Sequence, residues 1–142
     1  MAVGSHLLVD CQGISRDICL NDELMLDVLC RAAKQAGAHV ISQVRYRFVP
    51  PSPSGFTAIC LLDESHCSAH TYADEGMMAI DIFTCGGVNP LHVLSFVQEE
   101  IDLNNPSIRQ ISRFEYQDMP RVGLARGNGS IMDTSFLSTQ AS

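Results

Sequence analysis

Apolar and polar residues alternate along much of this chain in the two periods that distinguish strands from helices. The segment 6–11 (HLLVDC) is apolar enough for a buried strand. After Asn21, which suits an N-cap, apolar residues recur at helical spacing from Met25 to Ala36, and Gly37 ends the pattern. The spacing therefore predicts a strand followed by an amphipathic helix.

After this helix the pattern changes to the period of a strand. Val44, Tyr46 and Phe48 alternate with arginines, as in a strand with one face buried. The proline-rich segment 50–55 (PPSPSG) cannot continue a central strand, and it predicts a long connection to the next one.

Three further apolar segments predict strands at 56–62, 65–71 and 77–83, and a weaker pattern predicts one at 108–114. Before the last of these, Asn89 suits the N-cap of a second helix, whose inner positions are Leu94, Val97 and Ile101. Two helices among strands with short connections predict an α+β fold, a two-layer arrangement in which one antiparallel sheet carries helices on one face.

The second face of this sheet also needs a cover. The strand over 77–83 (MMAIDIF) is apolar on both faces, and the two helices cover only one. We therefore expect a homodimer that buries sheet against sheet as an αββα sandwich. The composition predicts one folded domain over 1–116 and a disordered tail over 117–142, where Gly, Ser, Thr and Asn prevail.

Composition and charge exclude several classes of protein. The chain has 142 residues, 46% hydrophobic and 18% charged, which suits one globular domain. A net charge of −7 without a basic stripe makes nucleic acid an unsuitable partner. No apolar run approaches ~20 residues, so we expect no membrane partner. Without a secretory signal at the start, we expect a cytoplasmic protein whose six scattered cysteines are reduced thiols.

Polar residues gather in the segment 64–71 (ESHCSAHT), and TCGG follows the next predicted strand. One interpretation is the solvent face of an edge strand. A second is a zinc site, because His66, Cys67 and His70 are ligand types. In an extended segment, however, the two histidines stand ~13 Å apart, so we expect no metal there. A third interpretation is covalent catalysis.

The third interpretation rests on a family resemblance. The string ESHCSAHT, a short acidic turn containing Gly76, and then AIDIFTCGG resemble the prokaryotic type of S-adenosylmethionine decarboxylase, a small pyruvoyl-dependent enzyme. The resemblance extends from His6 to about Phe114. Within it, the positions that fall at the family's own separations are Ser65, His70 and Cys85.

The resemblance implies a carboxy-lyase that converts S-adenosylmethionine to S-adenosylmethioninamine and so supplies aminopropyl groups for spermidine biosynthesis. It implies a zymogen that cuts itself between Glu64 and Ser65 and turns Ser65 into the pyruvoyl cofactor. A Schiff base between the substrate amine and the pyruvoyl ketone then takes up the electron pair left by decarboxylation.

The resemblance also implies roles for individual residues. His70 transfers protons during processing, Thr57 supports processing where the family has a serine, and Cys85 returns a proton to the substrate. Phe48 stacks on the adenine, and Asp74 binds ribose hydroxyls or a cationic substrate. The alternatives are core packing for Phe48, an ordinary β-branched strand residue at Thr57 and a solvated turn at Asp74.

About 16 Å of extended chain separates Ser65 from His70, too far for a hydrogen bond. By resemblance the active site forms between two protomers. One protomer provides Ser65 and Cys85, and the other provides Thr57, His70 and Phe48.

The chain departs from the family pattern where Tyr72, Ala73 and Asp74 replace a usual Trp-Pro-Glu, at Ser5, and in the longer connection 50–55. These departures keep two alternatives open. One is a pyruvoyl-dependent arginine or ornithine decarboxylase, and the other is an unprocessed homologue that binds or regulates a partner.

Overall fold

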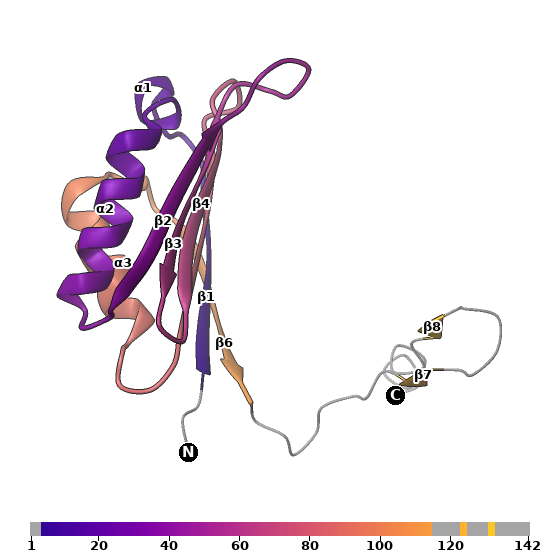
Figure 1. Ribbon diagram of the computed structural model, residues 1–142. Coiled ribbons are helices and arrows are strands. Elements are labelled where there is room, and N and C mark those ends of the chain that lie inside the picture. The colour runs from indigo at the N-terminus through magenta and orange to yellow at the C-terminus, as the bar shows by residue number, and fades with distance from the viewer. Residues whose placement is uncertain (1–3, 115–122, 125–130, 133–142) are drawn as a thin grey trace.

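Six strands pair into one antiparallel sheet in the order β2-β3-β4-β5-β1-β6 (Figure 1). The computed structural model describes residues 4–114, 123–124 and 131–132. The strands of the sheet are β1 (Gly4–Cys11), β2 (Val40–Arg47), β3 (Phe56–Leu62), β4 (His66–Tyr72), β5 (Met77–Thr84) and β6 (Ser107–Arg113). Each predicted strand is therefore confirmed, although several ends are shifted by a few residues.

The helices are α1 (Arg16–Cys19), α2 (Asp22–Gln35) and α3 (Pro90–Glu100). The predicted caps of the two longer helices are confirmed. The Asn21 side chain accepts a hydrogen bond from the Leu24 N–H (3.1 Å), and the Asn89 side chain accepts one from the Leu91 N–H (2.9 Å). Helix α1 was not predicted, because a single turn is too short to show a periodic pattern.

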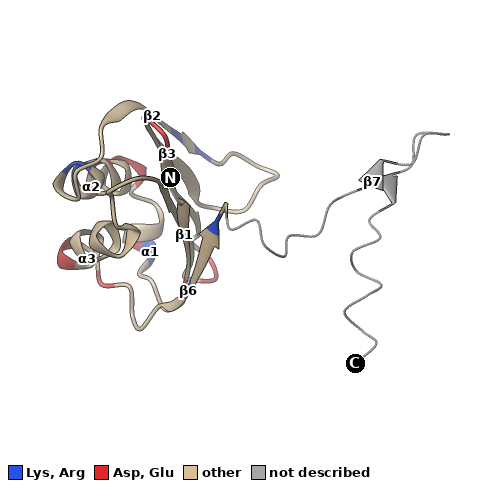
Figure 2. Ribbon diagram, turned by 90° about the horizontal axis from the view of Figure 1, so that it is seen from below, with Lys and Arg blue, Asp and Glu red and all other residues tan. Residues whose placement is uncertain are grey.

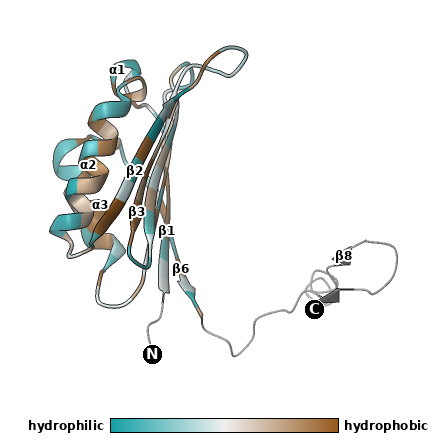
Figure 3. Cartoon of the chain, in the orientation of Figure 1, coloured by the Kyte–Doolittle hydropathy of each residue, from teal (hydrophilic) through white to brown (hydrophobic). Residues whose placement is uncertain are grey.

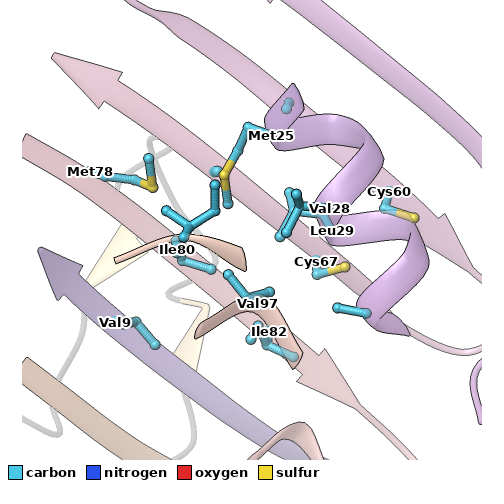
Figure 4. Close-up of a cluster of buried hydrophobic side chains, with 14 of the residues drawn as sticks. Val9, Met25, Val28, Leu29, Cys60, Cys67, Met78, Ile80, Ile82 and Val97 are labelled. Carbon is cyan, nitrogen blue, oxygen red and sulfur yellow. The ribbon is translucent and has the colours of Figure 1, made fainter. Parts of the chain in front are cut away.

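All three helices lie on the same face of the sheet, and the core fills the space between the two layers (Figures 1 and 4). The inward side chains of α2 and α3, including Met25, Leu29 and Val97, pack against fully buried strand residues such as Ile80 and Ile82. Each such buried side chain contributes about 1.5–3 kcal/mol relative to exposure. The predicted sheet with helices on one face is confirmed.

The opposite side of the sheet, here called the open face, is not covered within the described part of the chain (Figure 3). Several large apolar residues on this face are exposed to solvent, with exposed fractions of 59% for Val44, 57% for Tyr46, 49% for Leu61 and 47% for Ile111. Exposed apolar side chains gathered on one face of a sheet are typical of an interface. The sheet-to-sheet homodimer stays a prediction, and these side chains support it.

Strand β2 corrects one expectation. Its apolar alternating residues were expected to be the buried set, but Val44 and Tyr46 lie on the open face. Its arginines, seen as blue segments of β2 in Figure 2, lie on the helix side, where Arg45 and Arg47 bind the buried Asp22 at the start of α2. A period of two fixes which residues share a face, but it does not fix which face is covered.

Outside the sheet, β7 (Gly123–Leu124) and β8 (Ile131–Met132) pair with each other. The predicted tail 117–142 otherwise lies outside the described residues. None of the helices in the described ranges is long and apolar enough to cross a membrane.

Candidate active site

Ser65 lies in the tight turn between β3 and β4, directly before the first residue of β4. The Leu62 N–H donates a hydrogen bond of 3.0 Å to the Ser65 carbonyl oxygen and closes this turn. The Asp63 N–H donates to the His39 carbonyl oxygen (3.2 Å), which ties the turn to the segment after α2. The predicted cleavage point after Glu64 thus falls in a turn, where breaking the chain removes no strand pairing.

The sheet register brings Cys85 to Ser65 across twenty positions of sequence. Because His66 pairs with Phe83, the end of β5 lies beside the start of β4. The Cys85 N–H consequently donates a hydrogen bond of 3.1 Å to the Ser65 hydroxyl oxygen. A donor in this position also favours the deprotonated form of the hydroxyl.

The segment that follows Cys85 is held in place by its own contacts. The buried Thr84 hydroxyl donates a hydrogen bond of 2.8 Å to the Val88 carbonyl oxygen. Gly86 adopts φ +65°, a conformation that side chains disfavour, and so turns the chain sharply after Cys85.

Ser65 and Cys85 line a pocket of about 250 Å³ at this end of the sheet. Its other walls come from the connection after α2, the β3–β4 turn and the connection after β5, with the residues Gly37, Ala38, His39, Leu62, Asp63, Glu64, Gly86, Gly87 and Val88. The pocket is therefore large enough for a small substrate group to reach the Ser65 hydroxyl.

Thr57 and His70 form a second polar pair on the open face. They are directly opposite each other on β3 and β4, and the Thr57 hydroxyl lies 2.8 Å from Nδ1 of His70. This hydrogen bond fixes the orientation of the imidazole ring, which is a requirement for directed proton transfer.

The hydrogen-bonded pair Ser65–Cys85 and the pair Thr57–His70 lie at opposite ends of the sheet. His70 follows Ser65 by five positions, a span of about 16 Å in a strand. Phe48 follows β2 at the Thr57 end, where its ring lies 6.2 Å from that of Tyr46. Asp74 lies in the β4–β5 turn at the same end, and its carboxylate forms an exposed ion pair with Arg16.

A family model for S-adenosylmethionine decarboxylase matches residues 5–114. The chain belongs to this family. The match covers all six strands of the sheet and the helices packed on it. The resemblance noted in the sequence is thereby confirmed.

Individual members of the family are similar to this chain over most of their length. The S-adenosylmethionine decarboxylase proenzyme of Caldicellulosiruptor saccharolyticus is 27% identical over 122 residues, which cover 85% of this chain and 96% of the relative. That of Pelotomaculum thermopropionicum is 32% identical over 112 residues, covering 78% and 86%. The crystal structure of the adenosylmethionine decarboxylase from Aquifex aeolicus has a TM-score of 0.68 and 26% identity, covering 78% and 90%.

The cysteines of this S-adenosylmethionine decarboxylase family member are all free, as expected. Burial raises the pKa of Cys11 to about 11 and that of Cys30 to about 12, so these thiols are poor proton carriers near neutrality. Cys85 is the one cysteine of the described residues that is not fully buried.

The zinc interpretation of the sequence gains no support from the arrangement of its residues. Cys67 is buried on the helix side of β4, whereas His66 and His70 lie on the open face. In the ranges that the structure describes, no three His, Cys, Asp or Glu side chains gather as a metal site would require.

The sequence assigned His66 to packing or orientation but did not predict the group of rings beside Ser65 to which it belongs. His6, His66 and Phe83 lie within 6.1 Å of one another between ring centroids, and Arg113 lies over the Phe83 ring at 5.2 Å. Burial lowers the pKa of His6, against a smaller opposing effect of the Asp81 carboxylate. The alternation within 6–11 and 77–83 assigns His6 and Phe83 each to one face of its own strand. Only the registers of β1 and β4 against β5 bring these two rings and that of His66 together.

Proposed function

We propose that this chain is a proenzyme that cleaves itself between Glu64 and Ser65 and decarboxylates S-adenosylmethionine with the resulting pyruvoyl group. Membership of the family makes it a carboxy-lyase of polyamine biosynthesis, in the branch that leads to spermidine. The observation that carries the residue assignment is the 3.1 Å hydrogen bond from the Cys85 N–H to the Ser65 hydroxyl oxygen.

Self-cleavage uses only groups of the chain and one water molecule. The Ser65 oxygen attacks the Glu64 carbonyl carbon, so that a C–O bond forms and the C–N bond breaks. A base then removes the Cα proton of residue 65, and Glu64 leaves as a carboxylate that takes the serine oxygen with it. Water hydrolyses the remaining enamine, through its imine form, to a ketone, with release of ammonia. This route requires a hydroxyl on Cβ, which Ser65 supplies.

The neighbouring residues fit this chemistry. The Cys85 N–H stabilises the negative charge that the Ser65 oxygen carries once it loses its proton, and Glu64 is an exposed residue of the turn. His70, oriented by Thr57, is the group that moves protons. When formed, the pyruvoyl group supplies a carbonyl that accepts the electron pair from the broken C–C bond. The Cys85 thiol then protonates the substrate carbon.

A homodimer brings the two polar pairs together. In the proposed dimer, the two open faces pack against each other and a two-fold axis lies between them. The axis runs perpendicular to the strands, at the level of the paired residues Ile59 and Ser68. Rotation about this axis places the Ser65 end of one sheet against the Thr57 end of the other. Strands β3 and β4 then face the same two strands of the partner. Ser65 of one chain then meets Thr57 and His70 of the partner, and the exposed apolar open faces bury each other.

The same arrangement assigns the substrate side. Phe48 lies at the Thr57 end and therefore joins the partner's Ser65 pocket, where its ring stacks on adenine. Asp74 offers a carboxylate to the ribose or to the sulfonium cation, and the Arg16 ion pair holds that carboxylate at the turn.

Intact-mass spectrometry of the purified protein tests the proposal. We expect two fragments, 1–64 and 65–142, the second lighter than its sequence because serine has become pyruvoyl. Ser65→Ala should leave one full-length chain, whereas the matched control Ser68→Ala in β4 should still be cleaved. A wild-type chain that stays whole after long incubation contradicts the proposal and favours an unprocessed binding homologue.

The substrate is tested separately on the cleaved protein. We expect carbon dioxide release with S-adenosylmethionine and not with arginine or ornithine. Release with either amino acid instead would reassign the substrate while leaving the cleavage chemistry in place.

A further inference from the structure

The three rings His6, His66 and Phe83, here called the ring cluster, come from three adjacent strands at the Ser65 end of the open face. His66 on β4 pairs with Phe83 on β5, and Phe83 pairs with His6 on β1. The ring centroids are 5.7 Å apart for His66 and Phe83, 5.8 Å for His6 and Phe83, and 6.1 Å for the two histidines. Each ring therefore contacts both of the others.

A side chain of β6 also contacts the ring cluster. The guanidinium of Arg113 lies 5.2 Å from the centre of the Phe83 ring. Nε2 of His6 is buried and has no hydrogen-bond partner among the described residues. The half-buried His6 ring therefore acts as an aromatic packing group beside His66 and Phe83, which are half-buried as well.

Cleavage changes what holds residue 65 in place. Before it, residue 65 is tied to Glu64 by the peptide bond and to Cys85 by its hydroxyl oxygen. Afterwards the peptide bond is broken and the hydroxyl oxygen has left with Glu64. Two ties remain, namely the hydrogen bond from the Leu62 N–H to the residue 65 carbonyl oxygen and the covalent link to His66. Residue 65 becomes a chain end, and chain ends fray unless they are anchored.

We propose that His66, His6 and Phe83 are positioning residues that anchor this new chain end beside Cys85. The inference rests on the proposed function. Before cleavage the ring cluster is redundant, because the turn already fixes residue 65. After cleavage it holds the first residue of β4, and through that residue it keeps the reacting group within reach of the Cys85 thiol.

Hydrogen exchange of the amides of residues 66–69 separates this role from a general structural one. In the cleaved protein, His66→Ala should speed exchange at the start of β4 about 10-fold, the effect of losing two ring contacts. In the uncleavable Ser65→Ala background the same substitution should have much less effect, because Glu64 still tethers the strand. His66→Phe should restore slow exchange in the cleaved protein.

Turnover and cleavage complete the test. His66→Ala should still cleave fully, but its kcat should fall, and His66→Phe should recover most of it. His92→Ala, an exposed histidine on α3, is the matched control and should change nothing. If His66→Ala does not fold, His6→Ala should give the same pattern. Equal acceleration of exchange in both backgrounds, or none in the cleaved one, overturns the inference. Failure of the wild type to cleave overturns the proposed function instead.

Discussion

At the scale of single residues, the site depends on one backbone hydrogen bond and one thiol of the same residue. The Cys85 N–H reaches the Ser65 hydroxyl oxygen at 3.1 Å, and the Cys85 side chain is only partly buried. In the proposed mechanism the backbone donor serves cleavage, whereas the thiol returns a proton to the substrate. The two roles are therefore separable by substitution.

Replacing the thiol should affect turnover but not cleavage. Cys85→Ala keeps the backbone donor, so we expect nearly complete cleavage by intact mass. Loss of the proton donor should lower kcat by roughly 10²-fold, the lower end for general acid catalysis. The control Cys11→Ala removes a buried thiol at the other end of the sheet and should leave kcat unchanged. Unchanged turnover in Cys85→Ala would show that another group returns the proton.

At the scale of elements, α2 and β2 are joined by a buried carboxylate. Asp22, in the first turn of α2, is 3% exposed and binds both Arg45 and Arg47 of β2. Burial by itself raises the pKa of Asp22, but the hydrogen bonds from Arg47 and Arg45 outweigh it and lower the pKa overall. This contact fixes β2 against the helix and so directs Val44 and Tyr46 to the open face.

Asp22→Asn should destabilise the fold by about 2 kcal/mol at pH 7, because it removes charge-assisted hydrogen bonds at a buried site. Since the folded pKa of Asp22 lies below its unfolded value, its contribution is fully present above about pH 4 and disappears as the pH falls through the folded pKa. Urea unfolding at pH 7 and pH 3 should thus show a smaller difference between variant and wild type in acid. Asp27→Asn, in an exposed ion pair with Arg31, should cost well under 1 kcal/mol.

At the scale of the whole molecule, the distance along β4 is the reason for proposing an active site shared between two chains. The geometry of an extended strand separates Ser65 from His70 by about 16 Å in one chain, so under the proposed mechanism one folded protomer holds two half-sites. The proposed homodimer would carry two complete sites, each with Ser65 from one chain and His70 from the other.

Co-expression of two inactive variants tests this sharing. Ser65→Ala alone and His70→Ala alone should both stay largely uncleaved. In mixed dimers the His70→Ala chain still has Ser65 and receives His70 from its partner, so about half of that chain should be cleaved if the chains pair at random. Mass spectrometry distinguishes the chains by an added tag. No cleavage in the mixture would mean that Ser65 and His70 act within one chain.

Much of the fold followed from local patterns. The caps at Asn21 and Asn89 and the period-two runs gave both long helices and the six strands of the sheet. Local patterns did not give α1, a single turn, or the orientation of β2. In β2 the arginines are the residues that face the helix layer, because Asp22 pairs with them there.

The sequence by itself determined the family and the candidate residues for its chemistry, since the motifs around Ser65, His70 and Cys85 and their separations are enough to mark the family. Only the tertiary structure decided which of these residues are neighbours in space. It joined Ser65 to Cys85, kept both away from His70, and gathered His6, His66 and Phe83. The physical reason is that periodicity acts over neighbouring residues, whereas strand register couples positions far apart in the chain.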